Sequence, residues 1–247
     1  MTKNTTKKAA TKTSVFSCKE FDITQSENIM KVSTDAILLG AWTDIPASCS
    51  HILDIGTGSG ILALMLAQRA SEAMVTAIEI DQEAYQLAAG NFQKCKWSDR
   101  LAAINCSLHD FTYEEPFDLI ICNPPFFSGG VLSESPQKLV ARHTQKLSHQ
   151  DLLFSVKRLL SVDGLFSVVL PYVEGKRFIE LANNFNLYCT HEMNVRGSEH
   201  KPIERLLLTF SRTAKDTVTD SIVIEMEQRH KYSPEYIALT QSFYLNM

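Results

Sequence analysis

The chain has 247 residues, of which 45% are hydrophobic and 21% are charged, and its formal net charge is −4 at pH 7. This composition is typical of a globular protein and excludes wholesale disorder. Apolar runs fall far short of the ~20 residues of a membrane span, and the polar N-terminus lacks the apolar core of a secretory signal. We therefore expect a cytoplasmic protein without a membrane partner.

The six cysteines lie far apart and form no Cys-x-x-Cys pair. This spacing favours neither a structural zinc site nor a disulfide framework, so we expect no metal. Residues 1–19 carry five lysines and no acid, although the whole chain is acidic. Residues 1–15 have little to bury, and we expect a disordered basic tail there, followed by a single domain over residues 16–247.

From residue 35 onward, short β-type runs alternate with helical segments. Strands are predicted at 51–55, 74–79, 101–105, 118–122, 165–170, 187–192 and 205–211. Helices are predicted at 61–70, 81–94, 148–160 and 173–183, with one more strand and helix within 221–247. Asp81 and Ser148 are the expected N-caps of two helices. This alternation predicts an α/β fold with a mostly parallel sheet and helices on both faces.

Three glycines follow the first strand of this sheet, in the run Asp54-Ile-Gly56-Thr-Gly58-Ser-Gly60. Glycines let the backbone turn sharply and let a ligand approach closely, and such a turn faces the crevice of an open parallel sheet. A dinucleotide site requires Gly-x-Gly-x-x-Gly, but here the third glycine comes one residue early and Ile61 takes its place. The acid before the loop would repel a pyrophosphate, whereas it suits a cationic ligand.

The spacing Asp-x-Gly-x-Gly-x-Gly resembles motif I of the class I S-adenosylmethionine (SAM) methyltransferases. The resemblance implies a Rossmann-like fold with a seven-stranded sheet, and SAM, which carries an ammonium and a sulfonium, as cofactor. Glu79 ends the second strand, where a carboxylate accepts hydrogen bonds from ribose hydroxyls in related folds, and Ile80 follows it along the cofactor. Asp110 falls where the family places an acid near the adenine amino group, although an exposed loop acid is the alternative.

The run Asn123-Pro124-Pro125-Phe126 comes directly after the fourth strand. Two prolines fix the backbone and withhold two N–H donors, so the Asn123 side-chain oxygen and the Pro124 carbonyl are available to accept both hydrogens of a planar amino group. Phe126 offers a face on which a base stacks. This run resembles motif IV of amino methyltransferases that act on adenine N6, cytosine N4 or a glutamine amide. We expect these four residues to be catalytic, with Asn123 also beside the cofactor.

Two further segments narrow the resemblance. A polar Lys31-Val-Ser-Thr34-Asp35 stretch precedes a predicted amphipathic helix, and the aromatic-rich residues 232–245 are predicted to form a terminal helix. Together with the central motifs, these are similar to the bacterial tRNA(Val) adenine-N6 methyltransferase family, over most of residues 16–247. The resemblance implies methyl transfer from SAM to N6 of the adenine just 3′ of the anticodon, tRNA position 37. By position, Lys31, Thr34 and Asp35 close over the cofactor, and a helix cap is the alternative role for the last two.

An anticodon-loop substrate fits the local basic residues after the catalytic run. Phosphates are attracted by basic patches even on an acidic protein, and the residues expected to hold the RNA backbone are Lys138, Arg142, His143 and Lys146. A loop over residues 196–205 is a second candidate for RNA contact. We expect a monomer that binds tRNA(Val).

Four alternatives remain open at this point. A protein-glutamine N5 methyltransferase acting on release factors shares the Asn-Pro-Pro run, but that family carries a separate N-terminal helical domain, and only about 50 residues precede the first strand. An N6-adenine methyltransferase on another RNA or on DNA needs the same motifs. An NAD-dependent oxidoreductase or a noncatalytic RNA-binding protein on the same scaffold is disfavoured by the glycine spacing and by the intact Asn123.

Overall fold

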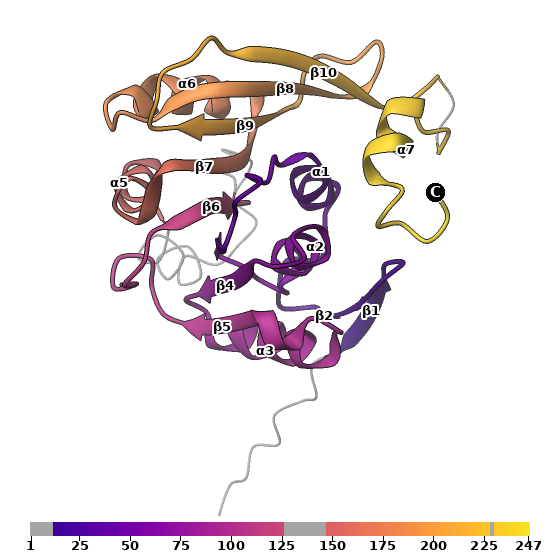
Figure 1. Ribbon diagram of the computed structural model, residues 1–247. Coiled ribbons are helices and arrows are strands. Elements are labelled where there is room, and N and C mark those ends of the chain that lie inside the picture. Colours follow the sequence, from indigo (N-terminus) through magenta and orange to yellow (C-terminus); the bar gives the residue numbers. More distant parts are fainter. Residues whose placement is uncertain (1–11, 126–146, 228–229) are drawn as a thin grey trace, which may run out of the picture.

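The computed structural model describes residues 12–125, 147–227 and 230–247 (Figure 1). Its strands are β1 (Thr13–Ser17), β2 (Asp22–Ser26), β3 (His51–Ile55), β4 (Met74–Glu79), β5 (Leu101–Asn105), β6 (Phe117–Cys122), β7 (Leu160–Pro171), β8 (Tyr188–Ser198), β9 (Arg205–Ser211) and β10 (Val218–Glu225). Its helices are α1 (Thr34–Trp42), α2 (Ile61–Arg69), α3 (Gln82–Lys94), the 3-10 helix η1 (Ser98–Arg100), α5 (His149–Leu159), α6 (Tyr172–Asn183) and α7 (Pro234–Thr240).

The main sheet has eight strands in the order β10-β8-β9-β7-β6-β3-β4-β5. Strands β7, β6, β3, β4 and β5 are parallel neighbours, and β9 runs antiparallel between β7 and β8. The mostly parallel α/β fold is confirmed, but the expected count of seven strands is wrong. The eighth strand is β10, which pairs in parallel with β8 at the sheet edge. The additional strand predicted within 221–247 corresponds to β10, which begins earlier, at Val218, and of whose residues only Ile222 is buried.

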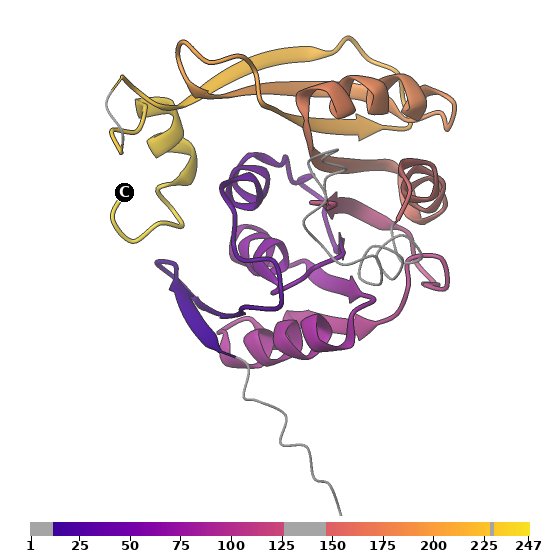
Figure 2. The ribbon, with the colours of Figure 1, turned by 180° about the vertical axis from the view of Figure 1, so that it is seen from behind.

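Helices cover both faces of the main sheet, as Figure 2 shows from behind. Residues along one strand alternate between the faces: Ile52 of β3 joins the core cluster under α1, α2 and α3, whereas Leu53 joins the cluster under α5 and α6. The central strand β6 contributes to both clusters and is buried along Leu119–Cys122. Such two-sided burial is expected of a central parallel strand.

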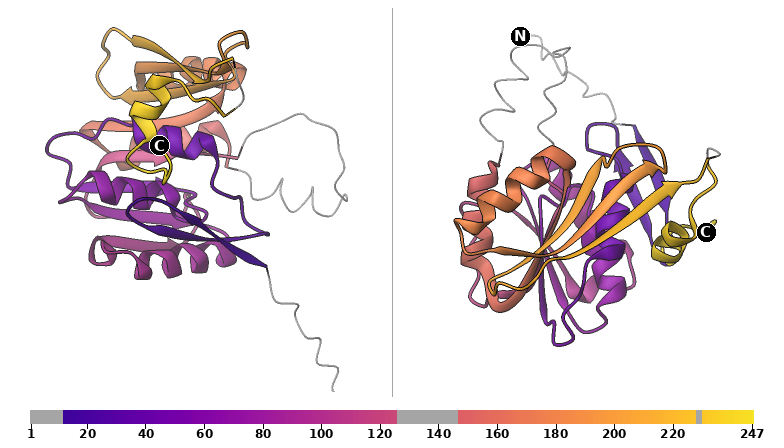
Figure 3. Two further views of the ribbon diagram at one scale, coloured as in Figure 1. Left: turned by 90° about the vertical axis from the view of Figure 1, so that its right-hand side faces the viewer. Right: turned by 90° about the horizontal axis from the view of Figure 1, so that it is seen from above.

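Strands β1 and β2 form a separate antiparallel hairpin. Residues 13–15, which we expected in the disordered tail, belong to β1 and pair with residues 24–26; residues 1–11 lie outside the described part of the chain. The hairpin lies beside α3 and the C-terminal segment, which Figure 3 shows from two further directions. On α3, the buried Asn91 exchanges two 3.0 Å hydrogen bonds with the backbone of Thr24 and donates a third, of 2.8 Å, to the carbonyl of Ser59.

The seven predicted strands and four predicted helices are confirmed; β3, β4, β5 and β9 have the predicted bounds, and the other elements have shifted ends. The largest shifts are in β7, which begins at Leu160, and in β8, which continues to Ser198. Asp81 and Ser148 are the N-caps of α3 and α5, as predicted, and accept hydrogen bonds from the amides of Ala84 and Asp151. None of the helices in the described ranges combines the length and the hydrophobicity that a membrane span requires. All six cysteines are free thiols.

Candidate active site

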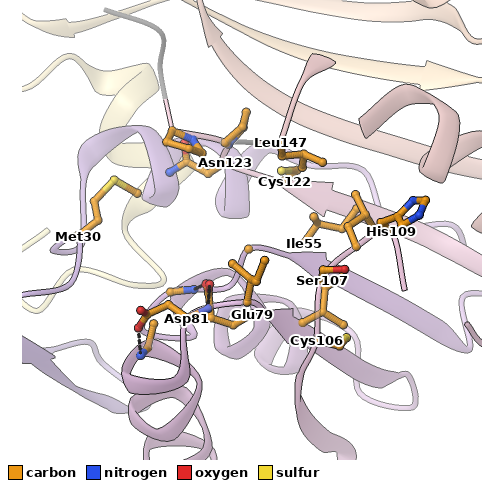
Figure 4. A pocket seen from close by; sticks show the side chains of 18 of the residues that line it. Met30, Ile55, Glu79, Asp81, Cys106, Ser107, His109, Cys122, Asn123 and Leu147 are labelled. Atoms are coloured by element: carbon orange, nitrogen blue, oxygen red, sulfur yellow. Dashed lines mark hydrogen bonds between the residues drawn. The ribbon is translucent and has the colours of Figure 1, made fainter. Parts of the chain in front are cut away.

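A cavity of about 770 Å³ opens at the carboxyl ends of β3, β4, β5 and β6 (Figure 4). This is the edge at which open parallel sheets bind ligands, and the volume is that of an ordinary ligand site. Seven predicted site residues line it: Gly56, Gly58, Glu79, Ile80, Asn123, Pro124 and Pro125. The structure therefore brings the glycine loop, the strand-end acid and the Asn-Pro-Pro run together around one cavity.

The three glycines of the loop all have positive φ, of 68°, 58° and 90°, a conformation that side chains disfavour. A Cβ added at Gly56 or Gly58 would meet nothing within 4 Å, because both residues face the cavity. A Cβ at Gly60 would lie 2.5 Å from a ring carbon of the buried Phe92. Gly60 does not line the cavity, so its smallness serves the packing of α3 rather than the approach of a ligand.

Asp54, which we expected to contact a cationic ligand, is fully buried beneath the loop. One carboxylate oxygen accepts hydrogen bonds from the hydroxyl of Thr57 at 2.5 Å and from the amide of Ala63 at 3.2 Å, which fastens the loop to the start of α2. The other oxygen is buried without a partner among the described residues. Burial raises the pKa of Asp54 to about 7, and the carboxylate of Glu79 adds to the shift.

Glu79 stands at the end of β4 and uses both carboxylate oxygens to hold the backbone around it. One oxygen accepts from the amide of Gly58 and the other from the amide of Asp81, both at 3.0 Å. A carboxylate has about four acceptor sites, so two remain for a ligand in the cavity. This geometry suits a pair of ribose hydroxyls, which is the predicted role of Glu79.

Asn123 follows the buried β6 and lies across the cavity from Glu79 in Figure 4. Cys122 directly before it is buried, and burial raises the pKa of this thiol well above its ordinary value, so it is a neutral wall group and no nucleophile. Pro124 and Pro125 continue the wall. Phe126, the fourth predicted catalytic residue, lies outside the described residues, as do the four expected RNA contacts Lys138, Arg142, His143 and Lys146.

Four other predicted cofactor residues do not line the cavity, namely Lys31, Thr34, Asp35 and Asp110. Ser33 is the N-cap of α1, and the carboxylate of Asp35 pairs with the guanidinium of Arg205 at 3.0 Å. Asp110 is engaged by Ser107, whose hydroxyl donates to it at 2.7 Å. The β5 end therefore presents Ser107, and not Asp110, to the cavity.

One wall of the cavity, Asn28, Ile29 and Met30, was not predicted. It follows the hairpin and is held from two sides. Glu83 on α3 accepts hydrogen bonds from Asn28 at 3.3 Å and from the Ser26 hydroxyl at 3.5 Å, and the Gln25 side chain accepts from the amide of Val32 at 2.8 Å. The two contacts of Glu83 join residues that are 55 and 57 positions apart in the sequence, so no local sequence pattern predicts them.

Helix α5 supplies a further unpredicted lining, with Asp151, Phe154 and Ser155. Phe154 is 62% exposed although it is a large apolar side chain. Ile80 on the β4 side and Met30 on the new wall are also apolar and are 49% and 61% exposed. The cavity thus has an apolar rim, as expected of a site that takes flat or apolar ligand parts. Across the described ranges, His, Cys, Asp and Glu side chains form no group that could hold a metal ion.

The fold and this site are those of a small-domain methyltransferase. Residues 7–162 match the family model described as methyltransferase small domain. A tRNA1(Val) (adenine(37)-N6)-methyltransferase of Flavobacterium psychrophilum is 45% identical over 236 residues, which are 94% of this chain and 100% of that protein. The enzyme of that name from Vibrio parahaemolyticus is 41% identical over 94% of this chain and 96% of its own length. The chain belongs to the tRNA1(Val) (adenine(37)-N6)-methyltransferase family.

Solved structures share the fold at low sequence identity. A predicted O-methyltransferase from Agrobacterium tumefaciens has a TM-score of 0.67 at 16% identity, over 85% of this chain and 96% of its own. Pyrococcus horikoshii TYW2, solved in complex with MeSAdo, has a TM-score of 0.58 at 15% identity, over 83% of this chain and 74% of its own. At such identities the likeness supports the architecture and leaves the substrate to other evidence.

Proposed function

We propose that this chain transfers the methyl group of SAM to N6 of adenine 37 in tRNA1(Val), the base immediately 3′ of the anticodon. The observation that carries the proposal is the placement of Asn123-Pro124-Pro125 across one cavity from the glycine loop and Glu79, in a chain 45% identical to a protein of that name. The proposal places the reaction in the cytoplasm and treats the protein as a monomer.

The cavity fits the proposed cofactor in three respects. Two acceptor sites on Glu79 are available to ribose hydroxyls. Open space at Gly56 and Gly58 allows the methionine part to approach the backbone. The apolar rim at Ile80 and Phe154 suits the adenine ring. When bound, SAM supplies a methyl group made electrophilic by its sulfonium.

The protein's part in the reaction is to orient a weak nucleophile. The lone pair of an adenine amino group is delocalised into the ring. Acceptors on both amino hydrogens, the Asn123 side-chain oxygen and the Pro124 carbonyl, localise that pair on nitrogen and aim it at the methyl carbon. Holding the reacting atoms at near-attack distance contributes about 7–11 kcal/mol. The amine's extra proton leaves to water after transfer, so no strong base is needed.

The proposed substrate is physically reasonable because anticodon-loop bases are partly unstacked. Extruding such a base costs less than flipping one out of a duplex, which takes a few kcal/mol. We assign the contact with the RNA backbone to Lys138, Arg142, His143 and Lys146, which follow the catalytic run in the sequence. Phosphate contacts of this kind position the RNA and carry no sequence information.

The test is incubation of unmodified tRNA1(Val) with the protein and SAM, followed by mass spectrometry of the nucleosides. We expect N6-methyladenosine at position 37, and Asn123→Ala is expected to lower kcat about 100- to 1,000-fold, the usual cost of removing one preorganised hydrogen-bonding group at a reacting atom. Asn183→Ala is the matched control, because Asn183 is an exposed asparagine on α6.

Two results would contradict the proposal. The first is methylation of a release-factor glutamine with none of tRNA1(Val), which would select the glutamine N5 alternative. The second is full activity of Asn123→Ala on tRNA. This result would contradict the catalytic role of the Asn-Pro-Pro run, although the tRNA substrate would stand.

A further inference from the structure

The turn after β5 presents one hydroxyl to the cavity, that of Ser107. We infer that Ser107, oriented by Asp110, is the specificity-determining residue for the purine base of the cofactor: it accepts a hydrogen bond from a 6-amino group and disfavours a 6-keto group. This inference rests on the proposed function, because it takes the ligand at this end of the cavity to be the adenosyl part of SAM.

The hydrogen-bond accounting of Ser107 leads to this assignment. A serine hydroxyl has one proton to donate and two lone pairs to accept with. The proton goes to a carboxylate oxygen of Asp110 at 2.7 Å, and one lone pair accepts the backbone amide of Asp110 at 3.2 Å. One lone pair remains. Toward a ligand Ser107 is therefore an acceptor only, and it pairs with an amino hydrogen but not with a carbonyl oxygen.

Backbone and side-chain hydrogen bonds fix the turn, so the Ser107 hydroxyl is held in the orientation in which it only accepts. The amide of Phe111 donates to the Ser107 carbonyl at 3.0 Å, and the guanidinium of Arg158 on α5 donates to the Phe111 carbonyl at 2.9 Å. The amide of Cys106 donates to the Glu79 carbonyl at 3.1 Å. The Ser107 hydroxyl is thus fixed relative to Glu79, and so to the ribose that Glu79 would hold.

The position of the base follows from the position of the ribose. A nucleobase is attached directly to its ribose, so it must lie next to Glu79 within the cavity. On the β5 side of Glu79 the lining continues with the apolar Ile80 and then Cys106, Ser107 and His109. Figure 4 shows Cys106, Ser107 and His109 on one side of the cavity. An aliphatic face beside a hydrogen-bonding edge is what a purine needs for stacking and in-plane recognition.

Two neighbouring polar side chains of the lining, Cys106 and His109, differ from Ser107 in their hydrogen-bonding capacity. Burial raises the pKa of the Cys106 thiol, which keeps it neutral and a weak donor. His109 is an exposed imidazole that either donates or accepts according to its tautomer. Neither is limited to accepting, so neither discriminates between amino and keto groups as Ser107 does.

The test is calorimetric binding of S-adenosylhomocysteine and S-inosylhomocysteine to the full chain. The second ligand carries a keto oxygen in place of the 6-amino group. We expect the wild type to bind the adenosyl ligand about tenfold more tightly or better, the difference that one mispaired hydrogen bond produces. Ser107→Ala is expected to reduce this ratio to within about threefold.

Asp110→Ala is the decisive variant, because Asp110 does not line the cavity. Its removal frees the Ser107 proton to face the ligand, so binding of S-inosylhomocysteine should improve while binding of S-adenosylhomocysteine changes little. If Asp110 only stabilised the turn, Asp110→Ala would bind both ligands more weakly, by the same factor. His109→Ala, in the same lining, and Asp163→Ala, an exposed acid of β7, are controls that should keep the wild-type ratio.

Each outcome decides something. Equal binding of the two ligands by the wild type, or an unchanged ratio in Asp110→Ala, would overturn the inference and leave the cofactor assignment standing. No binding of either ligand by the wild type would overturn both.

Discussion

The cavity has two kinds of wall, and they are built differently. The floor is formed by three short motifs at strand ends, the glycine loop after β3, Glu79 at the end of β4 and Asn123 after β6, each held largely by its own strand and its neighbours. The side wall at Asn28–Met30 has no strand behind it and is tied down by side chains from β2 and α3. The parallel sheet thus brings the reacting groups together, whereas the enclosure of the ligand depends on contacts between distant segments.

This difference implies that substitutions in the two walls fail in different ways. A change in or beneath the floor affects the packed sheet and its helices, so it should change folding stability. A change in the ties of the side wall leaves the core intact, so it should cost ligand affinity alone. Three variants test the contrast.

The largest effect is expected for Gly60→Ala in the floor. The substitution places a Cβ 2.5 Å from the buried ring of Phe92 at a residue with φ of 90°. Backbone strain and overpacking together should lower the free energy of unfolding by about 2–5 kcal/mol, measured by urea denaturation. Gly58→Ala is the matched control: its Cβ meets open space, so it should lose less stability but bind S-adenosylhomocysteine more weakly. Equal stability losses would contradict the division of roles among the glycines.

An intermediate effect is expected for Asp54→Asn, read as a function of pH. Burial raises the pKa of Asp54 from 3.8 to about 7, so the folded state binds this proton more tightly than the unfolded state does. The wild type therefore loses stability as the pH rises from about 4 to 7, and this group accounts for about 2–4 kcal/mol of the loss. The variant cannot ionise there.

Urea denaturation at pH 5 and pH 8 measures this effect. We expect Asp54→Asn to be less sensitive to pH than the wild type and to be the more stable protein at pH 8. Asp118→Asn is a control on the same sheet, since Asp118 accepts hydrogen bonds from the amides of Ser50 and His51 and lies outside the cavity lining. Parallel pH profiles for wild type and Asp54→Asn would refute the role assigned to its burial.

The smallest effect is expected for Glu83→Ala, which removes the tie to Asn28 and Ser26. Exposed hydrogen bonds of this kind contribute about 0.5–1.5 kcal/mol, so affinity for S-adenosylhomocysteine should fall about threefold with little change in melting temperature. Glu235→Ala is the matched control, because Glu235 is also an acid in the first turn of a helix, α7, away from the cavity. A lower melting temperature with unchanged affinity would place Glu83 among the folding residues instead.

The same contrast explains how much could be predicted from the sequence. The parallel sheet, its helices and the floor residues follow from local patterns, since strand, glycine turn and cap are each encoded within a few residues. The wall at Asn28–Met30 and the contribution of Phe154 depend on tertiary contacts that leave no local signal. Ser107 and Asp110 lie three positions apart in one turn, and Ser107 lines the cavity whereas Asp110 does not; the spacing of polar residues in the sequence does not tell which side chain of a turn faces inward.

One buried side chain, that of Asn91, connects the hairpin that precedes the side wall with the glycine loop of the floor. The carboxamide of Asn91 pairs with Thr24 in the hairpin as another strand would, and its remaining hydrogen reaches the carbonyl of Ser59 between the last two glycines of the loop. The conformations of the loop and of the hairpin are therefore coupled through the carboxamide of Asn91. If ligand binding reduces the conformational fluctuations of the loop, the amide hydrogens of β1 and β2 should exchange with solvent more slowly, although the ligand does not contact these strands.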